Sequence, residues 1–425
     1  MLTAISRYGA RVLPNTQQII AECQRRGELV RGPQIEEFEE AFAQRLGHGR
    51  AVSTSFGRMA FYYILKALDL PPGSEIILPA LTFWVIPELV RVAGLRPVFA
   101  DIDPGTFNLA PEALERAITT KTRAVVPTHL FGLPCDLDEI LSIGRHRGLF
   151  VIEDCAHTLG ATYRGRPVGT FGDAAFFSFQ TLKPLNTYGG GMALVQDPTL
   201  AQRVAALAAA EPWPDAKRIL GRLRVGRLQR IFTRPGVFTL SAFPILWTAS
   251  WLKARPDVYL WESIRPLSPL PPQYGERYSN VQAALGLAGL KLLDQWTKLT
   301  QAHAHLMNDT LRDLPGVRIP EVPPHRSHTY YQYCVYVPDR DDLVRRSIRK
   351  GIDIETLHVD VCTQLPLFGE SSNDAPGAKL AATVVQIPVY AGLSDHQVTQ
   401  IAKRVRSVLE RGTQRPIGVP KASHQ

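Results

Sequence analysis

Cysteine is scarce in this sequence. The 425 residues include an odd number of widely separated cysteines, namely Cys23, Cys135, Cys155, Cys334 and Cys362. This pattern contains neither a disulfide framework nor a Cys-x-x-Cys metal or redox pair. The first residues also lack the charged start, the unbroken apolar core and the small-residue cleavage site of a secretory signal. We therefore expect a cytoplasmic protein.

Acidic residues are missing from one stretch of the chain. The net charge is +9, and seven basic residues fall between Lys217 and Arg234 with no acid among them. No zinc-finger spacing, RNP-like aromatic motif or basic heptad region accompanies this segment, so we predict no nucleic-acid partner. We predict no metal site either, because His303 and His305 lie two residues apart on an expected helix and do not share a face.

The composition is that of an ordinary globular protein, with 45% hydrophobic and 20% charged residues. The length allows about two or three domains. We expect a large domain over residues 1–295 and a smaller C-terminal α+β domain over residues 296–412, followed by a frayed tail over 413–425. A proline-rich segment at about 211–275 interrupts the large domain and is interpreted as an insertion or lid.

Helical and strand-like patterns alternate between residues 34 and 200, which is typical of a parallel sheet. Helices are expected over 35–46, 58–69, 111–119 and 136–147. Buried strands are expected over 75–78, 97–100, 123–126, 149–152, 174–177 and 191–195, because these runs are continuously apolar. The predicted fold class is α/β, with three layers and a mostly parallel sheet. Later in the chain, residues 282–293 are expected to be helical and residues 330–337 to form a strand.

Two polar residues stand at the ends of expected strands. Asp154 follows the strand at 149–152, and Lys183 follows the strand at 174–177, shortly before three consecutive glycines at 189–191. A lysine near a strand end, beside glycines that permit close approach, suits the formation of a Schiff base. A carboxylate that keeps a pyridine nitrogen protonated is the other requirement of pyridoxal 5'-phosphate (PLP). The pair therefore predicts a PLP enzyme.

A series of ordered motifs resembles the DegT/StrS family of PLP-dependent aminotransferases, which have the aspartate aminotransferase-like fold type I. The resemblance extends from about Gly27 to Val408. The motifs are Phe38-Glu-Glu-Ala-Phe42, Ser55-Phe-Gly-Arg-Met-Ala60, Pro79-Ala-Leu-Thr-Phe83, Pro97-Val-Phe-Ala-Asp-Ile-Asp103, His129-Leu-Phe-Gly132, Glu153-Asp-Cys-Ala-His157, Gly172-Asp173 and Ser178 to Lys183.

The resemblance implies roles for the residues around the cofactor ring. Lys183 would form the Schiff base and move protons at the reacting carbon, and Asp154 would bind the ring nitrogen. His157 matches a position that faces the ring hydroxyl. Phe83 matches the aromatic residue that stacks on the ring, and the adjacent Trp84 is the alternative.

The resemblance also implies roles at the phosphate and at the dimer interface. Gly57 and Arg58 match the turn and helix start whose backbone amides hold the phosphate, and Ser178 would add a hydroxyl. Arg277 matches an arginine beside the active site, near the interface of a homodimer. His129 is either structural or adjacent to the substrate.

The sequence departs from the family pattern at four positions. Pro184 replaces the usual Asn after the lysine, and Gly189 replaces the Glu before the paired glycines. Gly275 replaces an Asn that helps the partner subunit to hold the phosphate, which puts that contact in doubt. Arg58 replaces a Thr and offers a charge-assisted phosphate contact instead.

The implied activity is transfer of an amino group, from glutamate, to the ketone of a nucleotide-linked or related sugar, as in the synthesis of cell-surface polysaccharides or antibiotic sugars. Two alternatives exist. Sugar dehydratases of the same family replace the Schiff-base lysine by histidine, and Lys183 argues against that activity. A non-catalytic regulator would not need to keep both Lys183 and Asp154.

Residues 217–253 allow two interpretations. Eighteen uncharged residues, Pro235 to Leu252, follow the basic run. Prolines and a glycine interrupt them, so we do not expect a transmembrane helix. The favoured interpretation is an apolar flap over the active site or the dimer partner. The other is a weak peripheral membrane contact at the inner face, which would suggest a lipid-linked or membrane-proximal ketone as acceptor.

Overall fold

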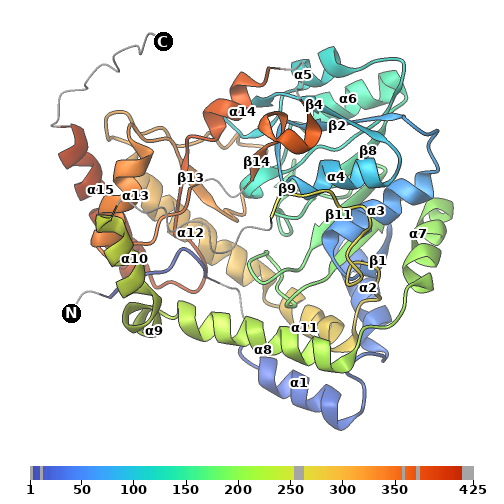
Figure 1. Cartoon of the computed structure of the whole chain (residues 1–425), viewed down its shortest axis with the longest axis horizontal. Coiled ribbons are helices and arrows are strands. Elements are labelled where there is room, and N and C mark those ends of the chain that lie inside the picture. Colours follow the sequence, from blue (N-terminus) through green and yellow to red (C-terminus); the bar gives the residue numbers. More distant parts are fainter. Residues whose placement is uncertain (1–2, 10–12, 253–262, 357–358, 370–373, 414–425) are drawn as a thin grey trace.

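The structure is a computed structural model that describes residues 3–9, 13–252, 263–356, 359–369 and 374–413. Residues 414–425 of the predicted tail, and Lys253, lie outside the described residues. A central sheet is flanked by helices, and a smaller group of helices and short strands lies beside it (Figure 1).

The central sheet has seven strands in the order β1-β12-β11-β8-β7-β2-β4. Strands β4, β2, β7, β8 and β11 are parallel, whereas β12 runs antiparallel to both of its neighbours, β1 and β11. The predicted mostly parallel sheet is thus confirmed. The strands are β1 (Arg50–Thr54), β2 (Glu75–Pro79), β4 (Arg96–Ala100), β7 (Thr122–Val125), β8 (Phe150–Asp154), β11 (Ala174–Ser178) and β12 (Gly191–Val195).

Both faces of this sheet are buried. Along β11, Phe176 packs into one apolar core, whereas its neighbours Ala175 and Phe177 pack into another. Consecutive residues of a strand point to opposite faces, so continuous hydrophobicity is required when helices cover both. Helices α3, α4 and α7 cover one face, and α2, α11, α5 and α6 cover the other.

Five of the helices that flank the sheet, α2, α3, α5, α6 and α11, lie close to predicted ranges, whereas α1, α4 and α7 were not predicted. Helix α2 ends at Gly47, which adopts the left-handed conformation (φ 77°) that terminates helices. The helices are α1 (Thr16–Arg25), α2 (Gln34–Leu46), α3 (Gly57–Leu68), α4 (Val85–Val92), α5 (Pro111–Ala117), α6 (Leu137–Arg147), α7 (Pro198–Ala210) and α11 (Asn280–Leu290).

The smaller group has its own apolar core, to which Ala4 and Ile5 at the start of the chain also contribute. The strand predicted over 330–337 is shorter than expected, because Tyr330 adopts a positive φ of 49° that is incompatible with a strand. Its elements are α12 (Leu293–Leu311), β13 (Tyr333–Val335), α13 (Arg340–Arg349), α14 (Pro376–Ala381), β15 (Val385–Ile387) and α15 (Asp395–Thr413). A two-stranded pairing of β3 (Leu81–Thr82) with β14 (Asp360–Val361) joins it to the large unit. Two further short pairs are β5 (Ile102–Asp103) with β6 (Asn108–Leu109) and β9 (Thr162–Tyr163) with β10 (Arg166–Pro167).

The described part of the predicted insertion, residues 211–252 and 263–275, contains the helices α8 (Ala216–Thr233), α9 (Pro235–Leu240) and α10 (Ala242–Trp251). Helix α8 lies low in Figure 1, above α1, and leads from the region of α11 toward α9 and α10, which lie near α13. It ends at Thr233 because Arg234, which precedes a proline, is extended (ψ 133°). Among the described residues, no helix is long and apolar enough to cross a membrane.

Candidate active site

A cavity of about 650 Å³ opens at the carboxyl ends of β8 and β11. Ligands of open α/β sheets bind at this edge. All seven residues predicted to bind the cofactor line the cavity, namely Gly57, Arg58, Phe83, Asp154, His157, Ser178 and Lys183. Trp84, the alternative to Phe83, lines it as well.

Asp154 and Lys183 are an acidic and a basic residue that both line this cavity. Asp154 is the last residue of β8 and is 5% exposed, with the N–H of Ala156 donating to its Oδ1 at 3.0 Å. Burial raises the pKa of Asp154 to about 6, although the Ala156 N–H and the Lys183 charge act in the opposite direction. Burial lowers the pKa of Lys183 to about 7, against the pull of Asp154 and with the help of the Arg58 charge. A substantial fraction of the Lys183 amine is therefore neutral, and nucleophilic, near pH 7.

The start of helix α3 forms a second part of the cavity. Phe56, the residue that precedes this helix, places no side-chain acceptor on the first backbone N–H groups. Such N–H groups, together with the helix dipole, form an anion site. A side chain at Gly57 is excluded, because its Cβ would lie 2.6 Å from the carbonyl oxygen of Phe177 and 2.9 Å from the Cβ of Ser178.

Arg58 lies among aromatic rings beside this helix start. Its guanidinium is 5.3 Å from the ring centroid of Phe83 and hydrogen bonds to the hydroxyl of Tyr274. Trp84 is 2% exposed and belongs to the apolar core, whereas Phe83 is only partly buried. Of the two aromatic residues, Phe83 is thus the one with more of its surface available to a ligand.

His157 lies in a stack of rings. Its imidazole is 4.1 Å from the ring of Tyr331 at an interplanar angle of 22°, and its Nδ1 accepts the N–H of Phe131 at 3.3 Å. Tyr331 also lies under the Lys183 ammonium, 4.7 Å from the ring centroid. Tyr331 was not among the site residues predicted from the sequence. Its only signal was a place in the aromatic run at 330–336, which resembled an ordinary strand.

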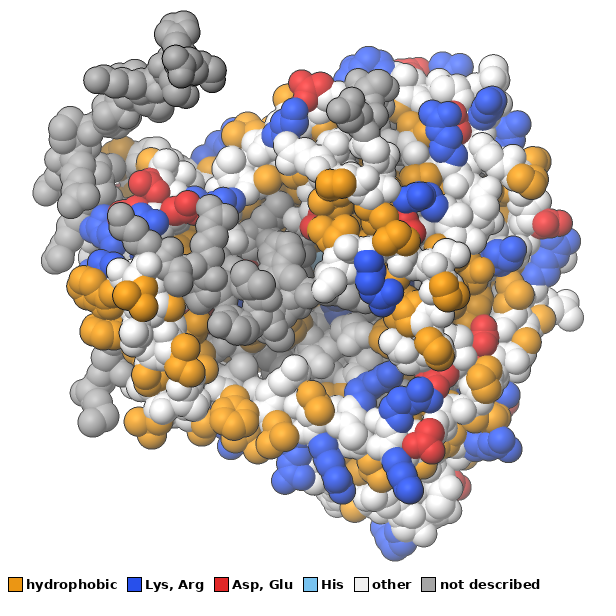
Figure 2. All heavy atoms as spheres, in the orientation of Figure 1, with side chains coloured by type: hydrophobic (Ala, Val, Ile, Leu, Met, Phe, Trp, Pro, Cys, Tyr) orange, Lys and Arg blue, Asp and Glu red, His pale blue; other side chains and the backbone are white. Residues whose placement is uncertain are grey.

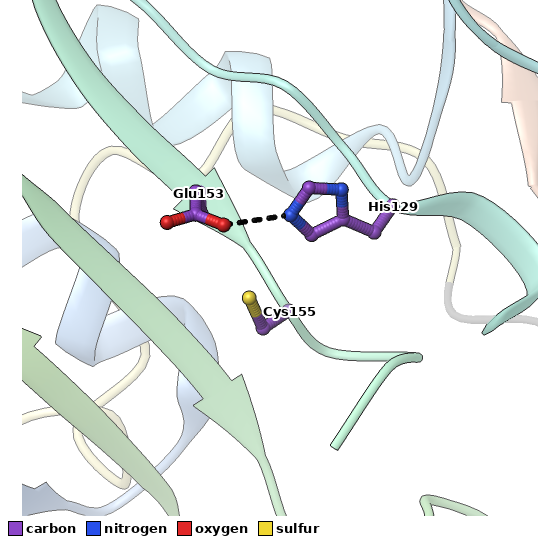
Figure 3. Close-up of side chains that lie close together, drawn as sticks. All are labelled: His129, Glu153 and Cys155. Atoms are coloured by element: carbon purple, nitrogen blue, oxygen red, sulfur yellow. Dashed lines mark hydrogen bonds and ion pairs between the residues drawn. The ribbon is translucent and has the colours of Figure 1, made fainter. Parts of the chain in front are cut away.

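His129 does not reach the cavity. It is fully buried and lies next to Glu153 and Cys155 (Figure 3). Its Nδ1 accepts the N–H of Cys135 at 3.0 Å, so the proton resides on Nε2, which donates to Glu153 at 3.1 Å. Of the two roles predicted for His129, the structural one agrees with this geometry.

Glu153 is the centre of this buried cluster. Its carboxylate accepts the N–H groups of Gly169, Phe171 and Gly172, each at 2.8 Å, in addition to His129. Burial would raise the pKa of Glu153, but these hydrogen bonds lower it below its usual value. Glu153 therefore holds the loop after β10 against the sheet, and both of its carboxylate oxygens accept hydrogen bonds from this loop.

Arg277 also lies outside the cavity lining. The Cζ of its guanidinium lies 3.9 Å from the ring centroid of Trp213, and its backbone N–H donates to the carbonyl of Pro212 at 3.0 Å. At Gly275 a Cβ would lie 2.9 Å from a carboxylate oxygen of Glu211, the end of a flexible side chain, so the geometry does not explain why glycine replaces the usual Asn. The structure therefore does not bring Arg277 together with Lys183 within one chain.

The glycines at 189–191 permit a close approach of backbone rather than of ligand. A Cβ at Gly191 would lie 2.2 Å from the backbone nitrogen of Gly57, and one at Gly190 would meet the ring of Tyr278 at 2.1 Å. Neither glycine lines the cavity. Gly191 thus lets β12 approach the start of α3, and Gly190 makes room for the ring of Tyr278.

Helix α8 forms one wall of the cavity. The sequence alone did not decide whether this segment covers the active site or contacts a membrane. Its lining residues lie on its second half: Val225, Leu228, Gln229, Arg230, Phe232 and Thr233. This placement agrees with the flap interpretation of the insertion. Contact with a membrane surface through residues 217–253 stays a prediction.

Comparison with known proteins identifies the family. The sequence matches the DegT/DnrJ/EryC1/StrS aminotransferase family over residues 13–226 and 259–406. This chain belongs to that family. The resemblance drawn from the motifs is thereby confirmed, and with it the aminotransferase class and the fold.

The alignments with individual relatives cover almost the whole of this chain. The spore coat polysaccharide biosynthesis protein SpsC of Bacillus subtilis is 31% identical, over 92% of this chain and 94% of its own. The GDP-perosamine synthase of Caulobacter vibrioides is 29% identical, over 96% and 99%. Among solved structures, the aminotransferase TlmJ of Streptoalloteichus hindustanus superposes with a TM-score of 0.78 at 26% identity, over 96% of this chain and 100% of its own.

Proposed function

We propose that this protein is a PLP-dependent aminotransferase that moves an amino group from glutamate to the keto group of a nucleotide-linked or related sugar. The observation that carries the proposal is the placement of Lys183 and Asp154 in one cavity, with a lowered pKa on the amine. The family and the names of relatives such as GDP-perosamine synthase support the choice of acceptor.

The residues of the cavity fit PLP. The Oγ1 of Thr82 and the Nε1 of Trp84 are buried beside it and have no hydrogen-bond partner among the described residues. The start of α3, with Arg58, offers an anion site for the phosphate. Asp154 provides a buried carboxylate for a ring cation, and Phe83 and Tyr331 provide aromatic surfaces.

When bound, PLP supplies an electron sink for the carbon that loses or gains the amino group. Lys183 would hold the cofactor covalently, and its amine would carry a proton to and from that carbon. Asp154 would keep the ring nitrogen protonated, because an adjacent carboxylate raises the pKa of a nitrogen cation. Arg58, Ser178 and the N–H groups at Gly57 would hold the phosphate. His157, fixed against Tyr331, would face the ring hydroxyl.

We further propose a homodimer. Arg277 lies outside the cavity of its own chain, as expected for an arginine that serves a partner subunit. Two-fold dimers are the commonest assembly of soluble enzymes.

The proposed activity is tested by measuring separately the reaction with the amino donor and the reaction with the keto acceptor. Enzyme loaded with PLP should change its absorbance when mixed with glutamate alone and should release 2-oxoglutarate. The original spectrum should return on addition of a keto sugar nucleotide. A protein that binds PLP but shows no change with any amino acid would instead support the regulator alternative.

A further inference from the structure

Helix α10 has an inner face that packs against the smaller group of elements. Phe243 lies in the apolar core of that group, and Ser250 is buried. The guanidinium of Arg349, on α13, donates to the backbone carbonyl oxygen of Ser250 at 2.9 Å. The preceding helix α9 is held in the same way, because Phe238 lies in the same core. Both helices are therefore fixed to the body of the molecule.

The opposite side of these two helices is exposed and apolar. Five large hydrophobic side chains form this outer face: Leu240, Ile245, Trp247, Trp251 and Leu252. Leu240, Ile245 and Leu252 are 81%, 69% and 75% exposed. The rings of the two tryptophans lie side by side, with their centroids 5.7 Å apart. By helical spacing, Ile245, Trp247 and Trp251 share the side of α10 that is opposite its buried residues.

An exposed face without charge is unusual for a surface helix. Surface helices place charged or polar residues outward, as α2 does with Glu36, Glu37 and Glu40. No charged residue occurs between Arg234 and Lys253. Because the inner face already makes the contacts that fix α9 and α10, the outer face is not needed to bury the core of the protein. Neighbouring exposed apolar side chains of this kind mark a surface that contacts a partner or a membrane.

Basic residues accompany the outer face. Arg224, Arg227 and Arg234 are exposed on α8 and at its junction with α9, and no acidic residue occurs between Asp215 and Asp257. Figure 2 shows hydrophobic side chains over α8, α9 and α10, with lysine and arginine side chains farther along the same edge of the molecule, over α8 and α1. The charge complement of this surface is therefore a partner that is anionic outside and apolar within.

We infer that the outer face of α9 and α10, together with the arginines of α8, contacts the surface of an anionic lipid bilayer. Trp247 and Trp251 would lie at the level of the lipid headgroups, where tryptophan is enriched in membrane proteins. Leu240, Ile245 and Leu252 would reach the boundary with the acyl chains, and the arginines would meet lipid phosphates. Such a contact lies in the plane of the membrane surface and needs no spanning helix.

A second copy of this chain could also cover an apolar face, but charge disfavours it. A two-fold contact pairs a surface with itself. The arginines of one copy would then approach a surface of the same sign, and the segment between Asp215 and Asp257 has no acidic residue to neutralise them. An anionic bilayer attracts the same arginines.

The outer face is separate from the active-site cavity. The residues of α8 that line the cavity include Val225, Leu228 and Phe232, whereas none of the five residues of the outer face lines it. The insertion can therefore form a wall of the cavity with α8 and contact a membrane with α9 and α10. Membrane binding by the outer face does not depend on the proposed aminotransferase activity.

Co-sedimentation of the PLP-loaded protein with lipid vesicles tests the inference. One set of vesicles contains phosphatidylcholine alone, and the other contains an equal mixture of phosphatidylcholine and the anionic lipid phosphatidylglycerol. At low salt we expect at least about tenfold tighter binding to the mixture, because each arginine near an anionic surface adds to the attraction. Added salt should weaken this binding, since it screens the charges.

Variants assign the binding to the outer face and to the arginines. Ile245→Ser and Trp247→Ser should each weaken binding to the mixed vesicles by about fivefold or more, because less apolar surface enters the bilayer. Arg224→Gln and Arg234→Gln should each reduce the preference for phosphatidylglycerol by about three- to fivefold.

Two further variants are matched controls. Leu380→Ser on α14 and Arg116→Gln on α5 change exposed residues of the same kinds, on helices that lie far from α10 in Figure 1. We expect each control to change vesicle binding less than about twofold.

Three results would overturn the inference. Equal binding to both kinds of vesicle, or no binding at low salt, would exclude an anionic bilayer as the partner. Outer-face variants that bind like the controls would show that the contact lies elsewhere. A Trp247→Ser variant that turns a dimer into a monomer, in light scattering without lipid, would assign the outer face to the subunit interface. None of these measurements uses amino transfer, so failure of the proposed function is recognised separately, as an enzyme that gives no spectral change with glutamate.

Discussion

Asp154 and Lys183 face one cavity, and burial shifts their pKa values toward each other, to about 6 and about 7. Each group opposes part of the effect of burial on the other, since the Lys183 charge lowers the pKa of Asp154 and the Asp154 charge raises the pKa of Lys183. The first two predictions follow from this relationship.

The reactivity of Lys183 should depend on pH with a midpoint near neutrality. A lowered pKa leaves the amine protonated below about pH 7 and neutral above it. The rate at which pyridoxal, which lacks the phosphate, attaches to cofactor-free protein should therefore rise through pH 7 and level off. Stopped-flow absorbance measures this rate. Arg58→Gln should move the midpoint upward and Asp154→Asn downward, because Arg58 lowers the lysine pKa and Asp154 raises it. A rate that still climbs between pH 9 and 10 would contradict the prediction.

Asp154→Asn should fold but lose most of its activity. The amide keeps the shape of the side chain but cannot hold a ring nitrogen in its protonated state. We expect turnover to fall by roughly 10²- to 10⁴-fold, a range typical of lost proton-transfer assistance. Circular dichroism checks that the variant is folded, and steady-state kinetics measures its turnover. Near-normal turnover would remove Asp154 from the mechanism.

His129→Ala should act on stability rather than on chemistry. The substitution leaves Glu153 buried without its histidine partner, which should lower the free energy of unfolding by about 2 kcal/mol. Denaturant unfolding measures this loss, and PLP affinity, measured by fluorescence titration, should be unchanged within about twofold. A large loss of PLP affinity in a protein of normal stability would show that His129 takes part in cofactor binding.

The active species should be a dimer. Light scattering should give twice the mass of the 47.1 kDa chain at assay concentrations. Arg277→Ala should weaken activity without preventing PLP attachment, because this arginine lies outside the cavity of its own chain. A fully active monomer would refute the homodimer.

The sequence predicted most of the fold because its strands are continuously apolar and its helices have clear ends, as at Gly47. It missed β1, since only Ala51 and Val52 are hydrophobic in that strand and the rest are small or polar. It also missed the antiparallel direction of β12, because an apolar run does not reveal strand direction.

The candidate site was predictable where a residue ends a strand or begins a helix, as Asp154 and Gly57 do. It was not predictable for Tyr331 or for α8. These residues reach the cavity only through tertiary packing, and their local patterns are those of an ordinary strand and of a helix with arginines on all sides. Arg277 shows the converse, since a matching motif gave its position in the sequence but not its distance from the cavity.

Attachment of PLP to Lys183 is tested directly by chemical reduction. Protein supplied with PLP is treated with borohydride, digested and mapped by mass spectrometry. We expect one modified peptide with the cofactor on Lys183, and a Lys183→Ala variant that binds PLP without a covalent link and loses activity by about 10³-fold or more. An adduct on another lysine, or an active Lys183→Ala enzyme, would contradict the account.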